Sequence, residues 1–514
     1  MKTLRNLLPN GLTLRFRSLV LPFLVIAVCK VTDVAAKDHA ALSHDDFYWI
    51  GEQNKASIIM LAEQGIVTKA LAAKIAQSVT QVIAEGAKAG AARPTDYLKI
   101  EKAMIKIASP EVSRIHSGRS RQDLGQTTRR CHLRDAVLAT FDQFIKARET
   151  LLKMAELDAN TILPFYTHNV QAQPTTLGHY LGGYLEALSR ESDRYQQAWA
   201  RLNLSPLGGA AGGTSSFPIN RQRLAELMGF DGLVVNSFDS GHISIQDVGV
   251  EFSSIAVSGA LTLSMFAADL TVQYANPTPW FRFAEERTGG SSIMPQKRNP
   301  YLLELFHEHT SLVTGKAVTY YIKCNNVMSG MNDYKSEMPL EVTLASGDLY
   351  RELATMLKAL VFDPERALQE VNSDYSMTTE LADMLQREAE VPFRVGHHFA
   401  SELVTYGRKN KLKPAEIPFK EAQQLFVAAA KEFGIERSLP LTEAQFRRAL
   451  TPENMVQSAK PIGGPQSAEV ARMLAGERER LKADRAWLAA TRAKLEEAAK
   501  QRDAGVTRLL GAAN

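Results

Sequence analysis

Apolar residues recur at helical spacing along most of the chain. The segments 56–86, 135–160 and 250–275 carry apolar positions three and four residues apart, and the first ends at Gly86. The third segment is apolar on nearly all sides, which predicts a helix buried among other helices. Strand-like alternation is scarce, and strands do not alternate with helices in any regular way. The pattern therefore predicts a mostly α-helical fold with a core of long packed helices.

Loops rich in Gly, Ser and Pro interrupt this pattern at 117–120, 205–218, 289–300 and 462–467. After about residue 375 the helical segments become shorter, and the charged tail 477–505 has one apolar stripe, typical of a packing or solvated helix. The predicted regions are a leader over 1–36, an N-terminal helical domain over 37–125, a central helical bundle over 126–375, and a C-terminal helical domain with a tail over 376–514.

The first 36 residues differ from the rest. Basic residues, among them Arg15 and Arg17, precede an uncharged apolar run over 19–29, and small residues follow up to Ala36. This pattern is typical of a secretory signal peptide, and the apolar run is short for a membrane span. The sequence predicts export, with the periplasm as destination. An uncleaved anchor is an alternative, as is a start codon placed too far upstream, which would leave the protein cytoplasmic.

Charge and cysteine content narrow the classes of partner and cofactor. The leader holds five of the 60 basic residues and one of the 56 acidic residues of this 514-residue chain, so the remainder carries equal numbers of each. A nucleic-acid partner would need a basic face, which this balance does not indicate. Cys29, Cys131 and Cys324 show neither a metal-binding spacing nor a disulfide framework. No metal and no organic cofactor is implied.

The segment 116–123, "HSGRSRQD", is the first of three that concentrate reactive polar groups. Arg119 and Arg121 stand two residues apart among Ser117, Gly118 and Ser120. A planar guanidinium can bind a carboxylate through two hydrogen bonds, and serine hydroxyls add further donors. The alternative is an ordinary exposed basic turn.

The second segment is "FYTHNVQAQP", residues 165–174. His168 is the side chain best suited to proton transfer near neutral pH, and Thr167 precedes it. The alternative is a structural histidine in a polar run whose members need partners if buried.

The third segment, "GGSSIMPQKRNP" over 289–300, lies between two segments with helical patterns. By composition it would be a flexible, solvated linker. Its pattern Gly-Ser-Ser-x-Met-Pro-x-Lys-x-Asn, however, resembles the signature of the fumarase/aspartase superfamily. The other two segments resemble the remaining signature regions, in the same order. The stretch 205–218 resembles a further Gly-rich segment of the superfamily. The stretches 60–67, 391–398 and 462–474 resemble the argininosuccinate lyase branch, so the resemblance covers roughly residues 45–475.

This resemblance implies an all-α fold with a long central bundle and smaller N- and C-terminal helical domains. It also implies a reaction in which an amine leaves a succinyl group and fumarate is released. Such a reaction needs a base, donors for the dianion that forms, and an acid for the leaving nitrogen. Members form homotetramers in which the three signature regions of one site come from different subunits. The partner would be a small N-succinyl amino acid.

The resemblance also implies roles for individual residues. Ser291 would be the base, activated by Lys297 and by backbone N–H groups that the glycines free, and His168 would act in proton transfer, oriented by Glu304. The loop would close over the substrate and exclude water. The predicted catalytic residues are Ser291, His168, Lys297 and Glu304; the predicted substrate-binding residues are Ser120, Arg121, Gln122, Thr167, Ser292 and Asn299.

The chain departs from the argininosuccinate lyase pattern around the amino-acid end of the substrate. Gln122 stands where that branch has Asn, and Val170 where it has Gln. The "SDRD" motif is replaced by 244–247, "SIQD", and the segment 329–339 places Met331, Ser336 and Pro339 at positions that are normally polar. Losing such partners costs roughly 1–3 kcal/mol each.

The succinyl half of the predicted site is therefore kept, and the arginine half is rebuilt. Together with export, this favours another N-substituted aspartate over argininosuccinate, such as an aminopolycarboxylate chelator of the ethylenediamine-disuccinate kind. The alternatives are argininosuccinate itself, a different leaving group such as water or adenylate, and a catalytically inactive relative that binds ligand or serves a structural role.

Overall fold

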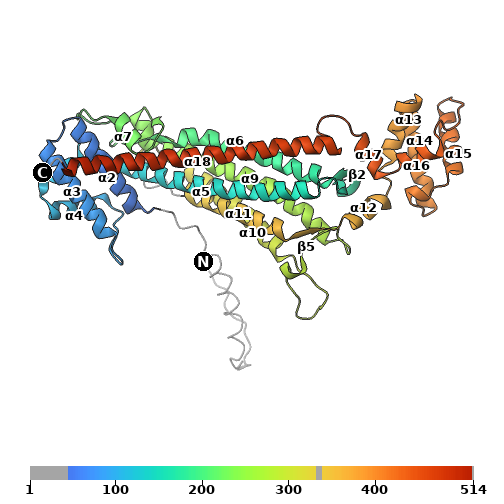
Figure 1. Ribbon diagram of the computed structural model, residues 1–514, viewed down its shortest axis with the longest axis horizontal. Coiled ribbons are helices and arrows are strands. Elements are labelled where there is room, and N and C mark those ends of the chain that lie inside the picture. The colour runs from blue at the N-terminus through green and yellow to red at the C-terminus, as the bar shows by residue number, and fades with distance from the viewer. Residues whose placement is uncertain (1–43, 332–337, 512–514) are drawn as a thin grey trace, which may run out of the picture. The chain divides into compact units, whose positions relative to one another are not determined.

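The computed structural model describes residues 44–331 and 338–511 of the chain (Figure 1). The predicted leader lies outside the described residues. Residues 42–514 form one compact unit, so the predicted boundaries at 125 and 375 stay predictions.

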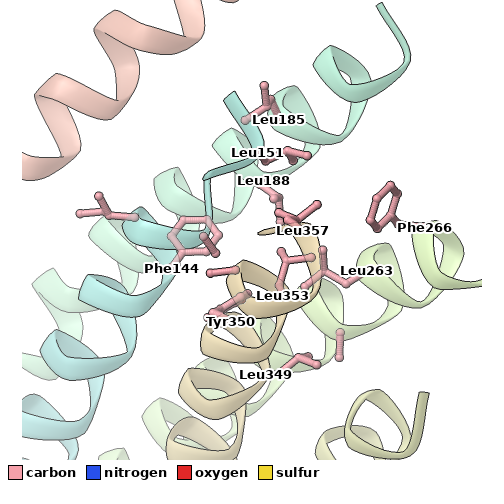
Figure 2. Close-up of a cluster of buried hydrophobic side chains, with 14 of the residues drawn as sticks. Phe144, Leu151, Leu185, Leu188, Leu263, Phe266, Leu349, Tyr350, Leu353 and Leu357 are labelled. Atoms are coloured by element: carbon pink, nitrogen blue, oxygen red, sulfur yellow. The ribbon is translucent and has the colours of Figure 1, made fainter. Parts of the chain in front are cut away.

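Six long helices form the central bundle, and each of them contacts at least two of the others. They are α5 (Arg121–Leu157), α6 (Leu177–Leu202), α9 (Ser244–Tyr274), α10 (Tyr301–Cys324), α11 (Met338–Ala359) and α18 (Ser467–Gly511). Their apolar faces bury a core of aromatic and leucine side chains, part of which is drawn in Figure 2 with Phe144, Phe266 and Tyr350 labelled. This burial is the main source of stability in such a bundle.

Shorter helices lie around the start of α5, and α18 ends among them. These are α2 (Asp46–Glu63), α3 (Lys69–Gly86), α4 (Tyr97–Ile107), the short 3-10 helix η1 (Pro110–His116) and α7 (Arg221–Leu227). The predicted single helix over 56–86 is wrong: it is two helices. Gly65 has a φ of 67°, a conformation that ends α2, and the hydroxyl of Thr68 caps α3.

A third apolar cluster is formed by residues 375–450. Its helices are α13 (Thr378–Ala389), α14 (Phe393–Lys409), α15 (Phe419–Glu432) and α16 (Glu443–Ala449), with the 3-10 helix η4 (Pro414–Glu416). Between this cluster and the bundle lie α12 (Pro364–Ser373) and α17 (Pro452–Ser458), which contact the hairpin described next.

Strands are few and short among the described residues. β1 (Ile162–Thr167) and β2 (Val170–Thr176) form an antiparallel hairpin directly after α5. β3 (Leu204–Ser205) pairs in parallel with β4 (Gly232–Leu233), and β5 (Phe281–Phe283) pairs antiparallel with β6 (Leu360–Phe362). The remaining short elements are α8 (Ser237–His242) and the 3-10 helix η2 (Glu285–Arg287).

Helix α9 departs from the prediction that all of its sides would be buried. It is long and apolar enough to span a membrane by length and composition, yet only 44% of its most apolar window is buried within the chain. One face packs in the core, and Leu261, Met265 and Val272 on another face are about half exposed.

Candidate active site

Helix α5 begins at a capping box that fixes the segment 116–123. The Ser120 hydroxyl accepts from the backbone N–H of Gln122 at 3.0 Å, and the Asp123 carboxylate accepts from the N–H of Ser120 at 2.8 Å. Asp123 is fully buried and also accepts from the N–H of Gly208 at 2.7 Å, which ties the Gly-rich loop 205–218 to the helix start. Burial raises the pKa of Asp123 to about 6, against the lowering effect of these N–H groups.

The two arginines of this segment have different surroundings. Arg119 is buried, and its guanidinium donates to the Ser57 hydroxyl at 2.9 Å and to the Asn54 side-chain oxygen at 2.8 Å. Arg119 therefore holds α2 against the start of α5 and is not free to bind a ligand. Arg121 is exposed, and no hydrogen-bond partner of its side chain is found among residues 44–331 and 338–511. Of the two, Arg121 is the one that can bind a carboxylate.

Arg121 and Gln122 line a polar cavity of about 440 Å³ at the start of α5. The side-chain N–H of Gln122 is already engaged, since it donates to the carbonyl of Gly241 at 2.6 Å. The cavity also has charged groups of both signs, which suit a ligand that is itself both acidic and basic. These are Asp46, Asp96 and Arg129, with Arg121.

Sequence reasoning missed Asp46 and Arg129. Asp46 lies in the first turn of α2, and its carboxylate is 2.7 Å from Nε2 of the buried His132. Arg129 lies two turns beyond Arg121 on the same helix. Helical spacing could have suggested that Arg129 shares a face with Arg121, because residues seven or eight apart do so. No local pattern indicated that Asp46 would lie across from them.

The hairpin places Thr167 and His168 at its tip, and both are exposed. His168 and Asn169 form a two-residue turn with φ angles of 53° and 59°, the left-handed conformation that a type I′ turn requires at both positions. Neither residue is glycine, so the turn is strained, which is common at functional sites.

A second cavity, of about 390 Å³, lies beside this hairpin. Its wall combines Phe165, Tyr166 and Asn169 of the hairpin with Tyr180, Gln273 and Trp280. At one edge the hydroxyls of Tyr180 and Tyr184 both donate to the Asp269 carboxylate, at 2.7 and 3.0 Å. The cavity is mainly apolar, unlike the charged cavity at the start of α5.

The loop 289–300 is closed at its neck and exposed beyond it. Gly289 and Asn299 exchange two backbone hydrogen bonds, at 2.8 and 2.7 Å, and the Asn299 side chain donates to the Gly290 carbonyl at 3.1 Å. Within the loop, the Ser291 hydroxyl accepts from the backbone N–H of Met294 at 3.2 Å. Ser292 and Lys297 are exposed, as is Glu304 in the first turn of α10.

A single chain does not bring these groups together. Arg121 stands at one end of α5 and the hairpin follows the other end; a 37-residue helix is about 55 Å long. No contact joins His168 to Glu304, or Lys297 to the Ser291 hydroxyl, within the part of the chain that the structure describes. The expected orientation of His168 by Glu304 is therefore not formed inside one chain.

The region expected to bind the amino-acid end of the substrate contains apolar residues. Ile245, from the segment that replaces "SDRD", and Pro339 line a small cavity that shares Arg129 with the charged cavity. Residues 332–337, which include the predicted substitution Ser336, lie outside the described residues.

Helices α9 and α10 present exposed apolar side chains along their lengths. On α10 these are Leu305, Leu312, Val318 and Ile322, the last of them 70% exposed; Leu261, Met265 and Val272 continue the set on α9. An exposed apolar surface of this kind is suited to contact with another molecule.

Comparison with known proteins identifies the family to which this fold and these segments belong. A family model described as lyase matches residues 30–315, and one described as argininosuccinate lyase C-terminal matches 375–457. The argininosuccinate lyase of Methanosarcina mazei is 32% identical over 423 residues, covering 81% of this chain and 83% of that protein. That of Methanothrix thermoacetophila is 30% identical and covers 91% and 96%. The crystal structure of EDDS lyase in complex with formate superposes with a TM-score of 0.82 at 28% identity, covering 91% of this chain and 92% of that one.

Fold and signature segments together define a helical lyase of the fumarase/aspartase type. The chain belongs to the argininosuccinate lyase branch of the fumarase/aspartase superfamily, and it is a carbon–nitrogen lyase. The resemblance inferred from the three segments, the expected all-α fold and the class of enzyme are confirmed.

Proposed function

We propose that this enzyme eliminates an amine from an N-substituted aspartate and releases fumarate, with Ser291 as the base. The observation that carries the residue assignment is the local geometry of Ser291. Its oxygen already accepts two backbone N–H groups, that of Met294 at 3.2 Å and that of Ile293 at 3.4 Å. A serine hydroxyl is a weak acid, and donors directed at its oxygen stabilise the alkoxide that proton abstraction requires.

The remaining predicted residues have roles that follow from their chemistry. Arg121 and Asn299, with Ser120, Thr167 and Ser292, would hold the two carboxylates of the succinyl group. His168 would act in proton transfer, with Glu304 as its partner from another subunit. Lys297 would supply positive charge near the carboxylate on which negative charge builds.

The working form would be a homotetramer whose sites each combine segments from different subunits. Two observations support this. Arg121 and the hairpin tip lie at opposite ends of α5, and the exposed apolar face of α9 and α10 is suited to packing against another copy. Mixing inactive variants tests it: Arg121→Ala and Ser291→Ala, co-unfolded and refolded together, should regain part of the activity. Refolded mixtures as inactive as either parent would contradict shared sites.

The charged cavity at the start of α5 would take the leaving amine. Asp46 and Arg129 there suit an amine that itself carries both a positive and a negative group, and the apolar Ile245 and Pro339 nearby do not suit a guanidinium. The favoured substrates are aminopolycarboxylates built on aspartate, for which the EDDS lyase likeness gives further support. Argininosuccinate is the second candidate, favoured by the curated relatives.

The test runs the reaction in reverse. Purified protein is incubated with fumarate and a panel that contains ethylenediamine, its mono-N-succinyl derivative, arginine and simple amino acids, and the loss of the ultraviolet absorbance of fumarate is followed. We expect the diamine series to react faster than arginine. Faster reaction with arginine would contradict the proposed substrate, and no consumption with any amine, while fumarate still binds, would favour an inactive relative.

Export through the leader 1–36 is also a proposal, supported by the pattern of its residues. Mass spectrometry of the mature N-terminus tests it. A first residue at or near position 37 in the periplasmic fraction supports export, whereas Met1 or Lys2 in the soluble cell extract contradicts it.

A further inference from the structure

Tyr166 connects the hairpin that carries Thr167 and His168 to helix α12. It directly precedes Thr167, and its hydroxyl donates a hydrogen bond to one carboxylate oxygen of Glu370. Burial and the nearby carboxylate raise the pKa of Tyr166 to about 12, so its hydroxyl keeps the proton it donates. The hydroxyl is thereby engaged by Glu370, while the Tyr166 side chain forms part of the wall of the cavity beside the hairpin.

Glu370 is itself held from two directions. Its second oxygen accepts from the guanidinium of Arg366 at 2.6 Å and from the side-chain amide of Asn276 at 3.1 Å. Arg366 in turn donates to the carbonyl of Thr278 at 2.8 Å. Hydrogen bonds to an ionised carboxylate are stronger than those between neutral groups. The carboxylate therefore joins α12, the connection after α9 and the hairpin at one point.

The opposite strand of the hairpin, β2, is also held by hydrogen bonds, to α12 and to the segment that follows it. Gln171 is the direct cross-strand neighbour of Tyr166. Its amide donates to the Ser376 hydroxyl at 2.6 Å and to the Val371 carbonyl at 3.2 Å. The pair Tyr166–Gln171 is thus fixed on both strands, immediately below the pair Thr167–Val170 and the strained turn at 168–169.

The register of the hairpin explains why the hydrogen bonds of Tyr166 and Gln171 are important for the direction of the turn. It shifts between Phe165 and Tyr166, which marks a bulge or irregularity two residue pairs before the turn. A bulge turns the following side chains to a new direction. Without an anchor beyond the bulge, the strained turn could relax and rotate His168.

We propose that Tyr166 and Glu370 are positioning residues that fix the direction in which the hairpin presents His168. This inference rests on the proposed function, because it assigns His168 a part in the reaction. Neither residue is assigned a contact with the reacting atoms. They act through His168, since a displacement of about 1 Å at a catalytic group can cost up to about a hundredfold in rate.

The experiment compares Tyr166→Phe in the wild-type and His168→Ala backgrounds, using the full-length protein. Kinetics are measured for fumarate addition to the fastest amine of the panel. Tyr184→Phe is the matched control, because its hydroxyl also donates to a carboxylate, that of Asp269, but lies outside the hairpin. We expect Tyr166→Phe to lower kcat roughly tenfold or more with KM little changed, and to have no further effect when His168 is alanine. Tyr184→Phe should keep the wild-type rate.

A second measurement does not depend on turnover. Hydrogen–deuterium exchange of peptides covering 162–176 should be faster in Tyr166→Phe and in Glu370→Ala, while peptides from α5 and α11 stay unchanged. The double variant Tyr166→Phe/Glu370→Ala should exchange no faster than Glu370→Ala alone, because both substitutions break the same link.

The outcomes separate the two proposals. If Tyr166→Phe slows the His168→Ala enzyme as much as the wild type, or leaves hairpin exchange unchanged, the positioning role is wrong. If His168→Ala keeps full activity, the role of His168 is wrong, whatever Tyr166 does. A loss of thermal stability equal in Tyr166→Phe and Tyr184→Phe, without faster hairpin exchange, also contradicts the positioning role.

Discussion

Arg148 on α5 and Asp484 on α18 form an ion pair that is buried from solvent, with Nη1 2.5 Å from Oδ2. The same guanidinium donates to the Ser189 hydroxyl on α6 and lies 3.5 Å from the carboxylate of Glu477. Gln196 donates to the other oxygen of Asp484 at 2.7 Å. Three helices of the bundle are therefore joined by one polar cluster within an apolar core.

Removing the positive charge from this cluster should destabilise the protein strongly. Arg148→Leu leaves the carboxylate of Asp484 buried without a counter-charge and Glu477 with only Arg480 at 3.9 Å, and we expect a loss of about 3–5 kcal/mol in the free energy of unfolding. Glu149→Gln is the control, because it breaks an exposed α5–α18 pair with Arg485 and should cost less than about 1 kcal/mol. Urea unfolding at fixed protein concentration measures both. Similar losses of unfolding free energy in the two variants would show that burial of the ion pair does not determine how much its removal destabilises the protein.

Replacing the proposed base should abolish turnover and spare binding. We expect Ser291→Ala to lower kcat by about 100- to 10,000-fold, the usual contribution of general base catalysis, while the Kd of fumarate changes little. Stopped-flow absorbance and calorimetry give the two quantities. Rates close to wild type in Ser291→Ala would refute the assignment of the base.

The exposed apolar face of α10 should carry the subunit contact. Leu312→Arg places a charge on this face, and we expect dissociation of the oligomer together with loss of activity, because no single chain holds a whole site. Val427→Arg on α15 is a matched control, since the two side chains are 48% and 46% exposed. Analytical ultracentrifugation measures both variants. An intact oligomer in Leu312→Arg would show that the subunit interface lies on another surface.

The stability of the protein should depend on pH through one histidine contact of α10, that between His309 and Glu352. His309 is hydrogen-bonded to Glu352, and this bond raises the pKa of His309 above its ordinary value near 6.5, helped by the charges of Glu308 and Asp348. A raised histidine pKa gives stability that is fully present below about 6.5 and is lost as the pH rises through the folded-state pKa. Glu352→Gln should therefore lower Tm near pH 6 and have little effect near pH 9. A deficit that is constant with pH would rule out this origin.

Much of the architecture could be predicted because helical periodicity is a local property. The long apolar segments became α5 and α9, and the Gly- and Pro-rich stretches became loops. The break at Gly65 was missed because apolar spacing continues across it. The degree of burial of α9 could not be predicted from the sequence either. A helix that is apolar on all sides can be buried inside one chain or at a surface shared between chains, and the pattern does not distinguish the two.

The candidate site was predicted only in part, for a similar reason. Arg119 and Arg121 look alike in the sequence, and their difference arises from Asn54 and Ser57, more than 60 residues away, which take up the guanidinium of Arg119. Asp46 was missed because its place in the charged cavity depends on how α2 packs across α5. The hydrogen bond between Tyr166 and Glu370 joins residues 204 positions apart, and no sequence motif connects them.

The path of α18 has a consequence for how the protein is made (Figure 1). This last helix runs along α5 and α6 and ends against α2, where Arg502 is paired with the buried Glu52 at 2.5 Å and Val506 joins the N-terminal apolar cluster. Arg502 is synthesised 450 residues after Glu52, so the first helices to emerge cannot finish their core before α18 has been made. Until then the apolar surface of these helices stays uncovered, and in that interval a holding chaperone would have most to protect.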